Sequence, residues 1–299
     1  MVRRQLALLA ALVALAPGAS VAGDPPADET PRKSSWSLFD DEEPPGPPLV
    51  QGEAGVVVWP YLDTAIRISR KNGLDGKRLD NAEDNAGLPS RWVSPSADLS
   101  IGTEFRGRVS YLDLDRQGDF TRSRETVDVG GGRVFADPGD PVRVGMHYTQ
   151  VDVLAQWDFL RGKTYRIGVF GGARVLRIAT RIQAFRFATF DYQSIAVNDW
   201  LVSPIGGGQF ELEPVPLFTF YANIRFIDWA WRQVALREER AFEMRVGFRV
   251  TFIEDVLSAG LDFRFLDVFV NPSDLNGGKN LAQYELEAGG VGFYVCAQY

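Results

Sequence analysis

The stretch Phe242–Phe252, FEMRVGFRVTF, alternates strictly between two kinds of side chain. Its even positions are Phe, Met or Val, and its odd positions are Glu, Arg, Gly or Thr. A period of two is typical of a β-strand, because successive side chains point to opposite faces of a sheet. Phe218–Phe226 and Leu257–Phe265 repeat the alternation. We therefore expect an all-β protein.

Alternation alone also fits a soluble sheet with one buried face. Two features favour a membrane protein instead. The segments have the roughly 9–11 residues that cross a bilayer at a tilt, and their apolar face is rich in Phe while the other face carries charges and glycines. In lipid, only closure into a barrel satisfies every backbone group of a sheet. We predict a closed antiparallel transmembrane β-barrel.

The N-terminus supplies a third feature, an export signal. Arg3 and Arg4 precede the apolar run Leu6–Ala16, and Ser20-Val21-Ala22 offers small residues for a signal peptidase. The run would rise only about 16 Å as a helix, which is too short for a hydrocarbon core of about 30 Å. We expect residues 1–22 to be a cleaved signal peptide.

Residues 23–53 differ in composition from the rest. They hold seven prolines, and eight acidic residues face two basic ones. Such a segment cannot bury enough apolar surface to fold, so we expect a disordered, acidic, Pro-rich tail, with the barrel in residues 54–299. Trp36–Phe39 is an apolar island in the tail, either a docking motif or a chance cluster.

The last segment carries a family resemblance. Val291, Phe293, Val295 and Tyr299 alternate up to the final aromatic residue. This resembles the C-terminal strand of bacterial outer-membrane β-barrel proteins, although that family usually ends in Phe. The region from about 55 to 299 looks like a small barrel of the OmpA/OmpW/OmpX type. The resemblance implies the outer membrane of a Gram-negative (diderm) bacterium and a tail in the periplasm.

The same resemblance suggests partners and roles. It implies contact with outer-membrane lipid and lipopolysaccharide, and recognition of the last strand by the barrel-assembly machinery. The tail could bind a periplasmic partner. The implied role is structural, or the passage of small solutes through a narrow pore. The chain's 39 acidic residues against 32 basic ones argue against a nucleic-acid partner.

Loop lengths give the strand count, because short periplasmic turns should alternate with longer outer loops. Working back from the C-terminus, the long loops are Gln183–Asn198, Asp228–Arg240 and Asn271–Asn280. The seven strands between connections are Val142–Phe159, Thr164–Ile182, Asp199–Leu212, Leu217–Ile227, Ala241–Ile253, Leu257–Phe269 and Leu281–Tyr299.

The N-terminal third leaves two possibilities. Val56–Ser69, Trp92–Phe105 and Arg108–Asp115, with a tight turn at Arg106-Gly107, give ten strands. If Asp98–Asp115 is one strand, the barrel has eight. Ten strands is the prediction and eight the alternative.

The pleat assigns side chains to the lumen. The predicted lumen-facing charges are Arg166, Arg174, Arg225, Arg245, Arg249, Arg264, Asp152, Asp158, Glu211, Glu213, Glu243 and Asp262, joined by Tyr221, Asn223 and Tyr294. Eight to ten strands enclose a space that side chains can fill. These charges therefore either form a salt-bridged interior or line a narrow solute path.

Candidate sites for chemistry are weak, and we expect neither an enzyme nor a cofactor. His147 is the only histidine, predicted to face lipid near the outer rim, so it is the one base open to a lipid-modifying hydrolase. Asp113, Asp115 and Asp119 resemble the start of a calcium loop, but Arg124 replaces its final glutamate. A further alternative is a surface interaction protein acting through loops near 71–91, 116–141 and 183–198.

Overall fold

The structure is a computed structural model. It describes residues 49–70, 76–128, 134–215, 217–231, 237–253, 256–271 and 280–299. The predicted signal peptide, the tail up to residue 48 and the Trp36–Phe39 island lie outside these residues. Among the described residues, no helix has the length and apolar character needed to cross a membrane.

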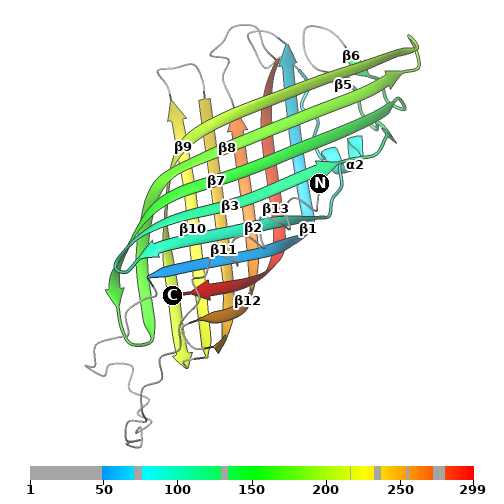
Figure 1. Cartoon of the computed structure of the whole chain (residues 1–299). Helices are drawn as coiled ribbons and strands as arrows, with labels where there is room; N and C mark the ends of the chain where they lie inside the picture. Colours follow the sequence, from blue (N-terminus) through cyan, green and yellow to red (C-terminus); the bar gives the residue numbers. More distant parts are fainter. Residues whose placement is uncertain are drawn as a thin grey trace, which may run out of the picture. The chain divides into compact units, whose positions relative to one another are not determined.

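Ten long antiparallel strands form one closed barrel, as predicted (Figure 1). They are β1 (Val50–Arg70), β2 (Trp92–Gly102), β3 (Phe105–Gln117), β7 (Pro141–Arg161), β8 (Tyr165–Arg186), β9 (Asp191–Val215), β10 (Phe218–Trp231), β11 (Arg237–Ile253), β12 (Leu257–Asn271) and β13 (Asn280–Gln298). Pairing of β1 with β13 and of β3 with β7 completes the ring. The eight-strand alternative is therefore wrong.

Four short elements complete the described chain. They are α2 (Ala82–Ala86), β4 (Thr121–Arg122), β5 (Val127–Asp128) and β6 (Val134–Ala136). We call the end of the barrel where β1 begins and β13 ends the lower end, and the opposite end the upper end.

Two predicted boundaries at the lower end are wrong. β1 begins at Val50, and residues 51–53 pair with the end of β13, so residues 50–53 do not belong to the tail. The turn between β2 and β3 lies at residues 103–104 after Gly102, not at Arg106-Gly107. Gly102 has a φ of +119°, a backbone conformation that favours glycine, whereas Gly107 continues the strand.

The predicted long outer loop Gln183–Asn198 is also wrong. β8 runs to Arg186 and β9 begins at Asp191, with residues 187–190 as the turn. Likewise, β10 ends only at Trp231 and β11 already begins at Arg237, so both strands extend into the predicted loop Asp228–Arg240. These strands rise well above the length that a bilayer requires.

The wall is continuous only in its lower half. Pairing of β2 with β3 stops upward at Ser96, and pairing of β9 with β10 stops at Gly206. Just above lie Pro95 and Pro204, which have no N–H to donate to a neighbouring strand. The upper half thus consists of two sheets with an apolar core between them. In Figure 1, β3, β7 and β8 lean away from β10–β13.

Side-chain polarity inverts between the two halves. In the lower part of β12, Phe263 points outward and is 62% exposed, whereas Asp262 points inward and is fully buried. Higher on the strand, the exposed Asp267 points outward, and Leu266 and Val268 are buried inside. The lower half is therefore apolar outside and charged inside, and the upper half resembles a soluble protein.

The inversion occurs close to one level around the barrel. On eight of the strands, the last residue of the lower outward apolar run and the first polar outward residue above it are Tyr61 and Asp63, Tyr111 and Asp113, Val151 and Thr149, Val175 and Arg177, Trp200 and Asn198, Phe226 and Asp228, Phe242 and Arg240, and Phe265 and Asp267. We call the outward apolar side chains below this level the apolar belt. Segments such as Phe242–Phe252 match the roughly 9–11 residues that cross a bilayer.

Part of the predicted 71–91 surface loop is instead packed inside. α2 is capped by the side chain of Asn81 and ends at Gly87, whose φ is +69°. Ala82, Ala86 and Leu88 are at most 2% exposed and belong to the upper core. This segment covers the edge of β1 that β2 leaves unpaired.

Candidate functional site

The lower lumen holds a continuous network of charged side chains. The structure brings together the arginines and acids that the pleat assigned to this face, and most of them form ion pairs there. Glu213 also has an interaction partner. The network has two centres, one around Asp262 and one around Asp152.

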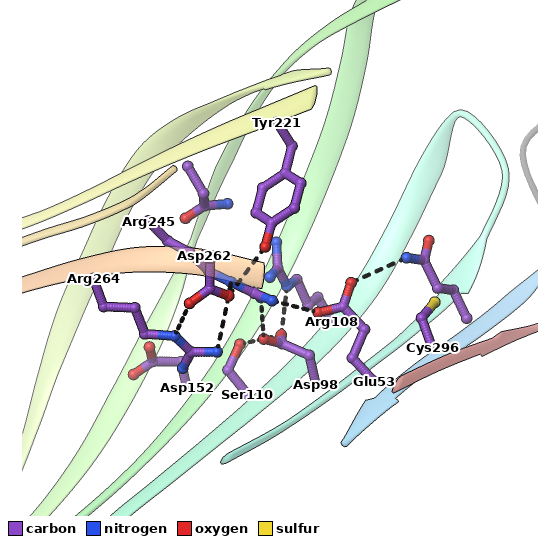
Figure 2. Close-up of polar contacts among 12 residues, drawn as sticks. Glu53, Asp98, Arg108, Ser110, Asp152, Tyr221, Arg245, Asp262, Arg264 and Cys296 are labelled. Atoms are coloured by element: carbon purple, nitrogen blue, oxygen red, sulfur yellow. Dashed lines mark hydrogen bonds and ion pairs between the residues drawn. The ribbon is translucent and has the colours of Figure 1, made fainter. Parts of the chain in front are cut away.

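Arg245 of β11 organises the first centre (Figure 2). Its Nε donates to Asp262 Oδ2 at 2.5 Å and its Nη2 to Glu53 Oε2 at 2.9 Å. Its guanidinium carbon lies 5.0 Å from the ring centre of Tyr221 and 4.8 Å from that of Tyr294. Both rings therefore hold the cation by cation–π contact.

Asp262 is shared by further donors. Arg264 Nε donates to Asp262 Oδ1 at 2.7 Å, and the Tyr221 hydroxyl donates to Oδ2 at 3.0 Å. The carboxylate is fully buried yet surrounded by donors. Such satisfaction is what allows a charge to remain buried.

The second centre is Asp152 of β7, also fully buried. Arg174 binds its two oxygens at 2.8 and 3.0 Å, and Arg225 Nη1 donates to Oδ2 at 2.8 Å. Arg174 Nη1 also lies 2.5 Å from Glu243 Oε1, on β11. This centre links strands on both sides of the lumen.

Several contacts run across the lumen, between strands that are not neighbours. Arg245 on β11 reaches Asp98 on β2 at 3.4 Å, and Arg108 on β3 donates to Gln209 on β9 at 3.0 Å. Two cavities lined by network residues measure about 40 and 60 Å³. Each has room for only a few water molecules. The interior is filled by its own side chains at this level.

Four members of the network were missed from the sequence. Glu53 was assigned to the tail and Arg106 to a turn, although Arg106 pairs with the buried Asp158 at 2.5 Å. Asp98 and Arg108 pair at 2.7 Å. The alternation of Asp98 with Leu99 was the available signal, because it places Asp98 on the face opposite an exposed apolar residue.

The three carboxylates of the calcium-like segment are not gathered. Asp113 and Asp115 point outward from β3, and Asp119 follows in the connection to β4. No group of three or more acidic, histidine or cysteine residues among those described is arranged to hold a metal ion. Asp113 instead contacts His147.

His147 lies on the outward face of β7, just above the apolar belt. Its Nε2 is 2.8 Å from Asp113 Oδ1 and 3.1 Å from Thr149 Oγ1, and Thr149 also donates to Asp113 at 2.8 Å. A Ser-His-Asp relay needs the acid on one ring nitrogen and the nucleophile on the other. Here Asp113 Oδ1 and Thr149 Oγ1 both contact the same ring nitrogen, Nε2. The arrangement fixes the imidazole but does not form such a relay.

Comparison with known proteins adds a likeness of fold. No family model and no curated protein matches the chain. Among solved structures, it is similar to the outer-membrane protease OmpT from Escherichia coli, with 8% identity, coverage of 89% of this chain and 100% of that chain, and a TM-score of 0.47. It is also similar to the translocator domain of the autotransporter NalP from Neisseria meningitidis, with 12% identity, 87% and 90% coverage, and a TM-score of 0.45.

A third similar structure is the outer-membrane protein OprG from Pseudomonas aeruginosa, with 10% identity, 83% and 96% coverage, and a TM-score of 0.36. The closed ten-stranded antiparallel barrel with its outward apolar belt itself defines the class. The fold is a closed ten-stranded antiparallel β-barrel, the architecture with which β-sheet proteins can cross a membrane.

Proposed function

We propose that the protein is a sealed, non-enzymatic barrel that serves a structural role in the outer membrane of a diderm bacterium. The lower half would lie in the bilayer, and the upper half would project outward as a rigid two-sheet head. The signal peptide would direct export, the tail would lie in the periplasm, and the assembly machinery would receive the β13 strand.

The membrane position is supported by the apolar belt. Large apolar side chains such as Phe220, Phe226, Phe252 and Val202 are 46–68% exposed on the lower wall. Exposing this much apolar surface to water would be costly. In a bilayer the same side chains would contact lipid acyl chains instead of water. Phe105, Trp157 and Phe159 cluster at the lower edge of the belt, where aromatic side chains suit the membrane interface.

The filled interior favours a sealed barrel over a path for solutes. The cross-lumen ion pairs of Arg245 and Asp152 fill the lower lumen, and an apolar core that includes Tyr148, Leu176 and Leu286 closes the upper half. An ion would have to break buried pairs and then enter an apolar interior, and each step is costly.

The test is ion conductance of the refolded protein in planar bilayers. We expect no discrete current steps, while the same sample shows the heat-dependent gel shift of a folded barrel. Arg245→Ala should also remain silent, because the apolar core above it is intact. Discrete steps in the wild type that change ion selectivity with Arg249→Glu would overturn the sealed barrel and support a narrow pore.

The location is tested separately in a diderm host. We expect the protein in the outer-membrane fraction, with a mature N-terminus at Gly23 after cleavage of residues 1–22. Recovery from the soluble fraction without detergent would contradict the membrane position whatever the conductance result.

A further inference from the structure

Positive charge gathers on the outer wall of β7, β8 and β9, directly above the apolar belt. Arg177 and Arg181 both point outward from β8, with Ala179 between them. The strand register places His147 on one side of Ala179 and Asn198 on the other. A strand rises about 3.3 Å per residue, so Arg177 and Arg181 lie about 13 Å apart, and the small Ala179 leaves room for both long side chains to reach toward the space between them. We call Arg177, Arg181, His147 and Asn198 the outer-wall patch.

Three of the four side chains are held in place by neighbours. Arg177 Nε donates to Asn198 Oδ1 at 3.1 Å, and its guanidinium carbon lies 5.4 Å from the ring centre of Trp200. His147 is fixed by Asp113 at 2.8 Å. The contacts of Arg177 use Nε and one face of the guanidinium, so its terminal N–H groups are available to an acceptor.

The patch differs from the lumen in its charge balance. Each of the six predicted lumen arginines has a carboxylate within 4.0 Å. Among the ion pairs between described residues, none includes Arg177 or Arg181. On the outward face of β3, beyond β7, Asp113 is bound by His147 and Thr149, and Asp115 faces His147 from the side away from β8. Two arginines thus face outward without an internal counter-charge.

The surroundings of the patch select a particular anion. Arg181 is flanked by Gly145 on β7 and by Ala196 on β9. Because these residues have no side chain or a small one, they leave space for a ligand beside Arg181. Guanidinium groups match the oxygens of phosphate in bidentate fashion. Directly below lie the outward side chains of Val175, Val202 and Trp200, the last two 68% and 57% exposed. A phosphate on the patch would therefore have apolar surface beneath it.

We propose that the outer-wall patch binds the phosphate group of a membrane lipid, whose acyl chains lie along Val175 and Val202. This inference rests on the proposed membrane position, because only that position brings lipid to this wall. The lipid class is one with an anionic phosphate headgroup in the leaflet at the upper edge of the belt. The side chains of Arg177 and Arg181 would contact the phosphate directly, and His147 and Asn198 would border it.

The experiment is a lipid titration of the full-length mature protein in detergent, followed by native mass spectrometry. The probe is dioleoylphosphatidic acid, compared with dioleoylglycerol, which has the same chains without phosphate, and with inorganic phosphate alone. We expect saturable binding of the phosphatidic acid only. Arg177→Gln/Arg181→Gln should weaken this binding at least tenfold. Arg91→Gln/Arg122→Gln removes the same charge from exposed positions elsewhere and should change it less than twofold.

The outcomes separate three ideas. Equal binding by both double variants would overturn the site, provided that the heat-dependent gel shift shows both to be folded. Inorganic phosphate binding as tightly as the lipid would overturn the assignment to lipid. Wild-type protein that stays soluble without detergent would contradict the proposed membrane position, and this is visible before any lipid is added.

Discussion

Arg245 and Asp262, on the neighbouring strands β11 and β12, meet at 2.5 Å in the middle of a lumen where Asp262 is fully buried. Truncating Arg245 would leave Asp262 and Glu53 short of their shared cation. Removal of one partner of a buried pair costs about 3–5 kcal/mol, because the other charge remains buried. We therefore expect Arg245→Ala to lower the free energy of unfolding by an amount of this order.

The measurement is the urea midpoint for unfolding in detergent. Arg122→Ala, at an exposed position of β4, is the matched control and should change the midpoint little. If Arg245→Ala and the control behaved alike, the network would not stabilise the barrel.

Arg116 and Glu83 provide a second prediction. Arg116 is fully buried, pairs with Glu83 of the α2 segment, and donates to Thr64 Oγ1 at 2.7 Å. Glu83→Ala leaves this guanidinium without its carboxylate, so we expect the segment to detach locally while the barrel stays folded. Hydrogen exchange should then rise at the Leu79 amide, which donates to Ile66 O at 2.8 Å.

Asp84→Ala is the control for that change. Asp84 lies next to Glu83 on α2, but its side chain is 63% exposed. Its loss should leave exchange at Leu79 unchanged within error. Faster exchange in both variants would point to loss of the helix itself and not to the Arg116 contact.

The sequence predicts the fold well where one period and one polarity hold together. In Phe242–Phe252 the outward face is apolar throughout. The sequence therefore predicts this strand, and its predicted last residue, Ile253, is also the last residue of β11. In Gln183–Asn198 the period of two persists, but the apolar residues, such as Ile195 and Val197, point inward. Because a strand in the lower wall has its apolar residues on the outward face, a stretch with the opposite polarity is mistaken for a loop. The inversion depends on the height of a residue along the barrel, which a short stretch of sequence does not reveal.

The candidate sites show the same limit. The pleat placed Arg245 and Asp262 on one face, but their contact with Glu53 depends on closure of β1 against β13. The sequence pattern places Glu53 in the tail, because the residues before it are acidic and Pro-rich. The Asp113–His147 contact joins residues 34 positions apart through the β3–β7 register, which no local sequence pattern indicates.

Glu239 predicts a dependence of stability on pH. It lies inside the barrel above the belt and is 1% exposed, and burial raises the pKa of its carboxyl. The hydrogen bond from Ser203 and the charge of Arg174 oppose this rise in pKa, whereas the charges of Glu243 and Asp152 add to it. The folded state therefore keeps the proton to higher pH than the unfolded chain. The associated stability is complete below the ordinary pKa of glutamate and is lost as pH rises through the raised value.

Glu239→Gln removes this titration while keeping the shape. We expect its unfolding midpoint to match the wild type at low pH and to exceed it increasingly as pH rises. Glu287→Gln, at an exposed outward position of β13, should show no such divergence. A Glu239→Gln variant that tracked the wild type at every pH would mean that Glu239 ionises freely in the folded state.

The level of polarity inversion gives the last prediction. Val246 of β11 points outward near the middle of the belt and is 40% exposed, whereas Asp267 of β12 points outward just above it. An arginine on the lipid face costs about 2–4 kcal/mol at the bilayer midplane and about 0–1 near the interface. Val246→Arg should therefore strongly destabilise the barrel refolded into lipid vesicles, and Asp267→Arg should not. Equal costs for the two would mean that the belt does not lie in hydrocarbon, since both side chains would then meet the same solvent.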